Sequence, residues 1–91
     1  MGNEQFIKLA KAAVVKYAND HLETTGITEE DVFISWSCKT LQNNKALAAT
    51  TLADGMYYEL TYNGDKDELY LDAYQKVENI CFDKPFDTEE E

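Results

Sequence analysis

The sequence predicts an α+β fold in which one N-terminal helix packs on a four-stranded antiparallel meander sheet. Apolar residues recur at three- and four-residue spacing near the N-terminus, which is typical of an amphipathic helix. Four short strand-like runs then fill the stretch from Asp31 to Tyr74. Three turn signals separate these runs, at Gln42–Lys45, Asp54-Gly55 and Asn63–Lys66.

The predicted helix runs from Glu4 to Glu23, with Asn3 as its N-cap. Gly26 suits the left-handed conformation that commonly follows a helix. An isolated helix of this length is marginal in water, so its apolar stripe must pack on the sheet. The stripe consists of Phe6, Ile7, Ala10, Ala13, Val14, Tyr17, Ala18, His21 and Leu22.

The strands should follow a single helical turn, because Thr28 and Asp31 are spaced as a capping pair. Their predicted ranges are Val32–Leu41, Ala46–Leu52, Met56–Tyr62 and Glu68–Tyr74. A meander in this order leaves the first and fourth strands as the two edges of the sheet. An unprotected edge can pair with a second copy, so a homodimer through a sheet edge is one expectation.

Pairing residues across the turns predicts the two faces. We take Asn43-Asn44 and Asp54-Gly55 as two-residue turns and residues 63–66 as a four-residue loop. Alternation then assigns to the core face Ile34, Trp36, Cys38, Leu47, Ala49, Tyr58, Leu60, Tyr62, Leu69, Leu71 and Ala73. The opposite face receives Phe33, Ser35, Ser37, Lys39, Ala48, Thr50, Tyr57, Glu59, Thr61, Tyr70, Asp72 and Tyr74.

The segment 75–82 fits two descriptions. It extends the fourth strand through a bulge near Gln75-Lys76, or it forms a short helix with its apolar residues on one stripe. The β-branched and aromatic residues at Ile80-Cys81-Phe82 favour the strand. We expect a single domain over residues 1–86 and a disordered acidic tail over residues 87–91.

Charge and hydropathy argue against nucleic-acid binding and against membrane insertion. The net charge is −10 with eight lysines and no arginine, and residues 51–91 contribute −9 of it, from three lysines and twelve acids. Direct binding to a nucleic-acid backbone is not expected, since such affinity comes from basic side chains. No apolar run has the length of a membrane span, and the N-terminus lacks the pattern of a signal peptide. We expect a cytoplasmic protein that does not bind membranes.

The cysteines, the histidine and the acidic loop do not form a known catalytic or metal-binding motif. Cys38 and Cys81 read as two buried, reduced thiols, and His21 reads as a partly buried core residue. Residues 63, 65 and 67 are spaced as the first ligands of a calcium loop, but Glu68 and Tyr74 occupy the positions of its glycine and its last ligand. We expect no catalytic residue, no metal ligand and no cofactor, and therefore no enzyme.

The candidate binding residues are Tyr57, Glu59, Tyr70, Asp72 and Tyr74, which share the outer face of the predicted sheet. Tyrosine offers a large contact area with a polar tip and is enriched at protein interfaces. The alternative is that these rings only cover the sheet. Glu59 and Asp72 also lie on neighbouring strands, which would suit a carboxylate pair, and we read them as solvated acids.

The chain resembles a group of short, uncharacterised proteins encoded by phages and prophages of Gram-positive bacteria. The similar stretches are Phe6–Lys11 with Tyr17-Ala18, Val32–Lys45 including Trp36-Ser37-Cys38-Lys39, Asp54–Glu59, Asn63–Lys66 and Tyr70–Tyr74. These motifs are structural. The resemblance implies a phage origin and a host-cell cytoplasmic location, and it implies no activity.

Together these observations predict a small acidic phage or prophage protein that acts as a non-enzymatic protein-binding module. Its partner would be a host or phage protein, such as a nucleic-acid-binding protein whose basic surface it masks. One alternative is a structural protein that self-associates into a homo-oligomer. A second alternative is a small hydrolase.

Overall fold

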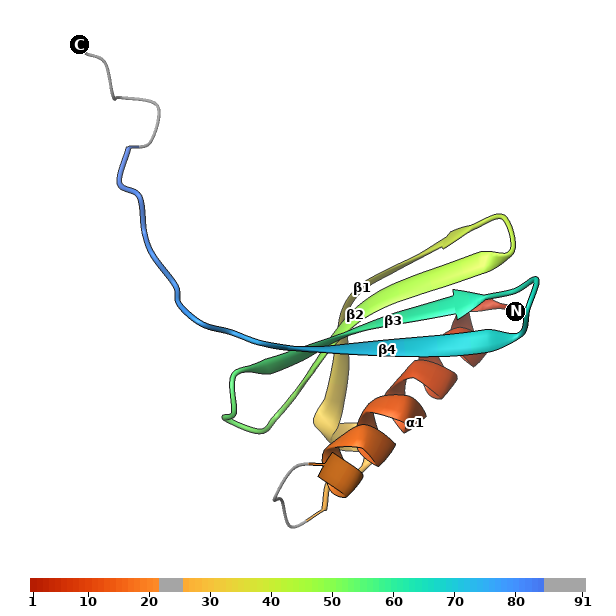
Figure 1. The fold of residues 1–91 in the computed structure, drawn as a ribbon, viewed down its shortest axis with the longest axis horizontal. Coiled ribbons are helices and arrows are strands. Elements are labelled where there is room, and N and C mark those ends of the chain that lie inside the picture. Colours follow the sequence, from red (N-terminus) through yellow and green to blue (C-terminus); the bar gives the residue numbers. More distant parts are fainter. Residues whose placement is uncertain (22–25, 85–91) are drawn as a thin grey trace.

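The computed structural model describes residues 1–21 and 26–84. Its elements are the helix α1 (Asn3–His21), the 3-10 turn η1 (Glu29–Asp31) and the strands β1 (Val32–Thr40), β2 (Asn43–Thr50), β3 (Met56–Asn63) and β4 (Glu68–Gln75). The strands form one antiparallel sheet in the order β1-β2-β3-β4, as Figure 1 shows. The predicted α+β fold, a single helix on a four-stranded meander, is confirmed.

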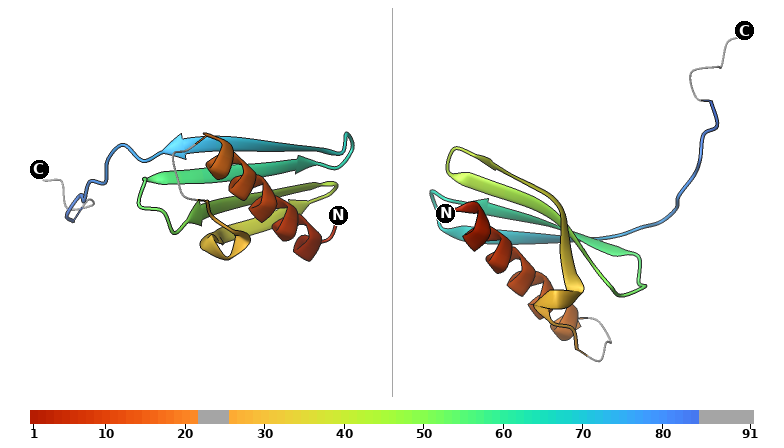
Figure 2. Two further views of the ribbon diagram at one scale, coloured as in Figure 1. Left: turned by 90° about the horizontal axis from the view of Figure 1, so that it is seen from below. Right: turned by 180° about the vertical axis from the view of Figure 1, so that it is seen from behind.

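Helix α1 crosses one face of the sheet, which we call the inner face (Figures 1 and 2). Its buried residues are Phe6, Ala10, Val14 and Ala18, which repeat every four positions and so lie on one side of the helix. They belong to one core cluster with residues of β2 and β3, among them Ala46, Ala48, Tyr58 and Leu60. The predicted helical stripe therefore supplies the helical half of the core.

The helix and β2 meet through small residues. Ala10 and Ala18 of α1 and Ala46 and Ala48 of β2 are all fully buried. Alanine has a single methyl side chain, so the helix can approach the sheet closely at these positions. The larger apolar side chains that are fully buried are Phe6, Val14, Tyr58 and Leu60.

The first hairpin turns earlier than the sequence predicted. Thr40 pairs with Asn43, so the turn is Leu41-Gln42, and both Asn43 and Asn44 belong to β2. Leu41 has a φ of 56° and Gln42 has no positive φ, and a positive φ at the first turn residue alone is the feature of a type II′ turn. The predicted turn at Asn43-Asn44 was wrong because asparagine favours turns only as a statistical preference, which strand pairing overrides here.

This shift reverses the two faces of β2. Ala46 and Ala48 lie under the helix, whereas Leu47 and Ala49, which were predicted for the core, lie on the opposite face. The second register also differs, because Ala48 pairs with Tyr58. The connection between β2 and β3 is longer than the predicted Asp54-Gly55 turn and takes residues 51–55. A one-residue change of register moves every side chain of a strand to the other face.

A bulge corrects the prediction for β1. The register shifts between Ile34 and Trp36, so that Ser35 is the extra residue. Val32 is buried on the inner face before the bulge, but Trp36 and Cys38 after it lie on the outer face. Trp36 is 46% exposed and is not a core residue. A bulge breaks the simple alternation on which the prediction rested.

The β3–β4 hairpin keeps the predicted faces. Its loop is residues 64–67, and Leu60 pairs with Leu71 instead of Leu69, a shift of two positions that leaves both on the inner face. The Asn63 Oδ1 accepts hydrogen bonds from the backbone N–H of Asp65 and of Lys66, which shapes the turn. The two edges of the sheet are β1 and β4, as predicted.

The segment after β4 follows neither description. The strand ends at Gln75, and residues 76–84, which we call the arm, have neither helix nor strand. The arm continues the line of β4 away from the sheet (Figure 1). The predicted tail at residues 87–91 and the predicted helix end at Glu23 lie outside the described residues.

The core assignment predicts losses of different size for two large-to-small substitutions. Leu60→Ala should lower the free energy of unfolding by about 2–5 kcal/mol, because Leu60 is fully buried and its loss leaves a cavity. Trp36→Ala should lower it by less than about 1.5 kcal/mol, since the residue is 46% exposed and buries less apolar area. Urea unfolding followed by circular dichroism measures both. A larger loss for Trp36→Ala than for Leu60→Ala would contradict the bulge.

A second prediction concerns the contact between two turns. A Cβ atom added at Gly64 would lie 2.0 Å from the carbonyl oxygen of Gln42, and the Gly64 N–H donates to the Asn43 Oδ1 at 3.2 Å. Gly64→Ala must push the two hairpin ends apart, and we expect a loss of about 1–3 kcal/mol. Gly2→Ala is the matched control because nothing lies near its added Cβ. Equal melting temperatures for the two variants would exclude this contact.

Candidate binding face

The outer face of the sheet is the face opposite α1, and it carries aromatic side chains from β1, β3 and β4. Cross-strand pairing aligns three rows on this face, which are Phe33–Ala49–Tyr57–Tyr74, Trp36–Leu47–Glu59–Asp72 and Cys38–Lys45–Thr61–Tyr70. The five large aromatic side chains in these rows are between 39% and 52% exposed. No described segment covers them, so the rows form one continuous surface that is largely apolar and faces water.

The structure brings together all five predicted binding residues. Tyr57 and Glu59 lie on β3, Tyr70, Asp72 and Tyr74 lie on β4, and all five point to the outer face. The rings of Tyr57 and Tyr74 stack with their centroids 5.1 Å apart and their planes at 16°. Such a stack holds both rings in place.

Two carboxylates lie directly opposite each other in the middle row. Glu59 pairs with Asp72, and like charges at opposed positions destabilise a sheet. The Lys45 Nζ offsets this with an ion pair to Glu59 at 3.1 Å, and the Tyr74 hydroxyl donates a weaker hydrogen bond to the same carboxylate at 3.4 Å. The hydrogen bond and charge of Glu59 raise the pKa of Lys45.

The tyrosine hydroxyls on β4 are tied to carboxylates. The Tyr70 hydroxyl donates to Glu68, and this hydrogen bond is the main cause that raises the pKa of Tyr70, because the ionised phenolate would face a second negative charge. Partial burial, followed by the charges of Glu59 and Asp72, raises the pKa of Tyr74. The β3–β4 side of the outer face is therefore acidic, and the β1–β2 side is mainly apolar.

Sequence reasoning missed Trp36 and Leu47 as members of this face. Both were placed in the core, Trp36 because the bulge at Ser35 was not foreseen and Leu47 because the first turn was misplaced. Strict alternation of Ile34, Trp36 and Cys38 gave no sign of a bulge. A signal for β2 did exist, since its other face carries the small residues that a closely packed helix needs.

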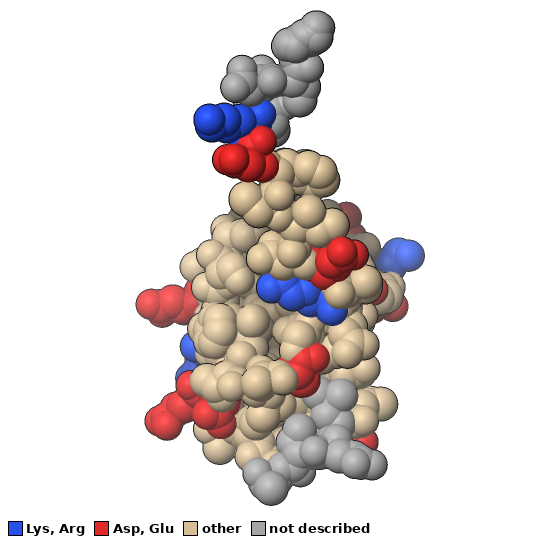
Figure 3. All heavy atoms as spheres, turned by 90° about the vertical axis from the view of Figure 1, so that its left-hand side faces the viewer, with Lys and Arg blue, Asp and Glu red and all other residues tan. Residues whose placement is uncertain are grey.

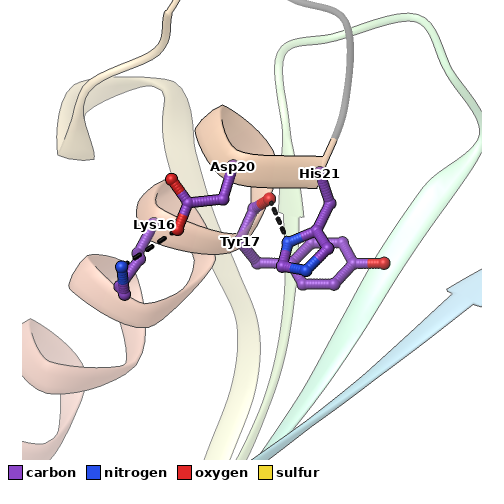
Figure 4. Close-up of polar contacts among 4 residues, drawn as sticks. All are labelled: Lys16, Tyr17, Asp20 and His21. Atoms are coloured by element: carbon purple, nitrogen blue, oxygen red, sulfur yellow. Dashed lines mark hydrogen bonds and ion pairs between the residues drawn. The ribbon is translucent and has the colours of Figure 1, made fainter.

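A groove lies on the inner face between α1 and β4. It encloses about 560 Å³ and is lined by Ala13, Lys16, Tyr17, Asp20, His21, Leu69, Leu71, Asp72 and Ala73. His21 stacks on Tyr17 at a centroid distance of 4.4 Å, and its Nδ1 lies 3.2 Å from the backbone oxygen of Tyr17 (Figure 4). Lys16 and Asp20 form an exposed ion pair beside them. His21 is exposed, so its predicted place in the core was wrong.

The cysteines and the acidic loop at residues 63–67 do not form a catalytic or metal site. Cys38 and Cys81 are free thiols and are exposed, not buried as predicted. In the loop that resembles a calcium site, the Asn63 oxygen accepts backbone N–H groups, and Asp67 accepts the Tyr62 hydroxyl at 2.6 Å. Within residues 1–21 and 26–84, no group of three or more His, Cys, Asp or Glu side chains is arranged to hold a metal ion.

The fold and the outer face define a small α+β protein with a single-layer sheet that is open on one side. The chain belongs to the family of unknown function DUF6275, whose model matches residues 7–84. Comparisons with curated proteins and with solved structures gave no match. The only long helix in the described part of the chain is not apolar enough to cross a membrane. Membership of an uncharacterised family is thus confirmed, while the phage origin stays a prediction.

The Tyr70–Glu68 contact predicts a pH effect. Glu68→Gln removes the charge that opposes ionisation, so the pKa of Tyr70 should fall toward the ordinary tyrosine value. The pKa of Tyr70 is higher in the folded than in the unfolded chain. The hydrogen bond to Glu68 therefore stabilises the fold fully at pH values below the ordinary tyrosine pKa, and this stabilisation is lost as the pH rises through the folded-state pKa. Ultraviolet titration of the wild type and of Glu68→Gln measures the difference, with Tyr70→Phe identifying the transition. An unchanged titration curve would show that the contact does not form in solution.

Proposed function

We propose that this chain is a small acidic phage or prophage protein that acts as a non-enzymatic binding module on a host or phage protein in the cytoplasm of the infected cell. The observation that carries the proposal is the uncovered outer face, where five aromatic side chains lie in three adjoining rows. A contiguous exposed apolar surface rimmed by polar residues marks an interaction site.

The chemistry of the face describes its partner. Trp36, Phe33 and Leu47 provide apolar contact area on the β1–β2 side. Glu59, Glu68 and Asp72 provide carboxylates on the β3–β4 side. A complementary protein surface has an apolar patch beside lysine or arginine side chains. The nucleic-acid-binding site of a protein has this composition, so the module would mask it by occupying the place of the nucleic acid.

A second hypothesis is that the outer face binds a single-stranded nucleic acid directly. Aromatic side chains on a four-stranded sheet can stack on unpaired bases. That mode also needs basic side chains along the backbone path, but the chain carries a net charge of −10 and has no arginine. Lys45, the basic residue within the three rows, is already paired with Glu59. Charge therefore favours a protein partner.

The proposal predicts which side chains hold the partner. Affinity purification from infected cells followed by mass spectrometry identifies the partner, and surface plasmon resonance then compares variants. Trp36→Ala and Tyr70→Ala should each weaken binding by about tenfold or more, mainly through faster dissociation, because buried aromatic side chains dominate interface energies. Leu41→Ala is the matched control, since Leu41 is 87% exposed in the β1–β2 turn and lies outside the three rows.

Two results would contradict this assignment. If Leu41→Ala weakens binding as much as Trp36→Ala, the outer face is not the recognition surface. If the purified chain binds single-stranded DNA or RNA at ~0.15 M salt, the module reads nucleic acid directly in spite of its charge. Circular dichroism of each variant keeps loss of binding distinct from loss of fold.

A further inference from the structure

The free edge of β4 presents unpaired backbone groups in a regular array. The Lys76 N–H donates to the Gly55 oxygen at 2.7 Å, and this pair continues the β3–β4 register. Hydrogen-bonded pairs alternate along an antiparallel ladder, so the even-numbered residues of β4 bond to β3. The odd-numbered residues Leu69, Leu71 and Ala73 direct their N–H and C=O groups to the free edge. Among the described segments, none pairs with this edge.

The arm carries apolar side chains that its own body does not cover. Val77, Ile80 and Phe82 are 93%, 57% and 75% exposed. Figure 3 views the molecule from the end where the arm emerges and shows it standing away from the body. Beyond Lys76 the arm has passed the last residue of β3 with which it could pair. Its backbone and its apolar side chains are thus both available to another surface.

We propose that this surface is β4 of a second copy of the chain, and that two copies pair antiparallel through β4 and the arm around a two-fold axis at Tyr74. Each arm then lies along the first half of the other copy's β4. The two sheets become one continuous sheet. This inference stands on the edge and the arm and does not depend on the proposed function of the outer face.

Charge selects the register. A two-fold axis perpendicular to the sheet places one residue opposite its own copy, and with Tyr74 at the axis Asp72 lies opposite Lys76 of the second copy, twice in the dimer. Moving the axis one residue later places Asp72 opposite Glu78, and two residues later places Lys76 opposite itself. Moving it one residue earlier opposes Glu68 and Glu78, and two residues earlier opposes Asp72 with itself. Like charges directly opposite are unfavourable, and in these four registers nothing offsets them as Lys45 offsets the opposition of Glu59 and Asp72, so the register at Tyr74 is favoured.

The same register completes both faces of β4. On the inner face it places Val77 of the second copy opposite Leu71, beside the groove between α1 and β4, whose apolar lining includes Leu69 and Tyr17. The arm therefore moves Val77 from water to an apolar site. On the outer face it places Tyr74 beside its own copy, so the aromatic rows of the two molecules adjoin.

Charge reversal tests the register in trans. Asp72→Lys and Lys76→Asp each replace two attractions by two repulsions, so each variant alone should dimerise at least about tenfold more weakly than the wild type. Mixing the two variants restores both attractions between unlike chains, so the mixture should form a heterodimer. Light scattering coupled to size exclusion across micromolar concentrations, at ~0.15 M salt to screen long-range repulsion, measures the masses.

Two further variants separate pairing from other effects. Lys8→Asp, on the exposed side of α1, makes the same charge change as Lys76→Asp and should leave the wild-type dimer intact. Ala73→Pro removes an N–H that points to the free edge and leaves the β3 ladder intact, as proline at an edge position does. It should abolish the dimer while circular dichroism shows the fold retained.

Three results would overturn the proposal. A wild-type chain that has the mass of a monomer at about 100 μM has no such edge pairing. Single variants that dimerise as well as the wild type exclude the Tyr74 register. A mixture of the two variants that gains no heterodimer shows that Asp72 and Lys76 do not pair between copies.

Discussion

The close contact between α1 and β2 is the constraint on which the rest of the structure depends. Because Ala10 and Ala18 of α1 and the inward residues Ala46 and Ala48 of β2 are fully buried in one core cluster, the helix can lie low on the sheet. The inner face of β2 must then hold its small residues, and Leu47 is forced to the outer face. The bulge at Ser35 has the same consequence for Trp36 on β1. The packing of the core therefore places Leu47 and Trp36 on the outer face. The sequence of β3 and β4 supplies the tyrosines of the same face.

The fold could be predicted from the sequence because its largest signals are local. The spacing of Phe6, Ala10, Val14 and Ala18 specifies the helix stripe, and the Asn63–Lys66 stretch specifies a hairpin whose faces came out correctly. The five binding candidates lie on β3 and β4, next to that hairpin, so they were placed on the right face. The prediction of where each candidate lies rested on one well-marked turn.

The faces of β1 and β2 could not be predicted from the sequence. In a meander each strand is placed by counting from the turn before it, so one misplaced turn or bulge puts the residues that follow on the wrong face. One misplaced turn inverts a strand, and a bulge inverts half of one. Leu41 in a left-handed turn position breaks the preference for glycine or asparagine, and nothing in the residues around Ser35 marks a bulge. The exposed state of Cys38, Trp36 and Leu47 follows from these two irregularities. Tertiary packing against the helix, which sequence periodicity does not report, decided between the two faces of β2.

The outer face also departs from what stability alone would favour. It opposes Glu59 and Asp72, leaves a tryptophan half in water and directs four tyrosine and phenylalanine rings to solvent. Departures from local consistency concentrate at functional surfaces, because there a binding partner supplies what the monomer lacks. If two copies join at Tyr74, the aromatic rows of both lie on one side of a continuous sheet. A partner with two matching patches would then engage both copies, and the second contact would form at the high effective concentration that tethering provides. Pairing through the open β4 edge and the arm would in that case give the protein two binding faces in place of one.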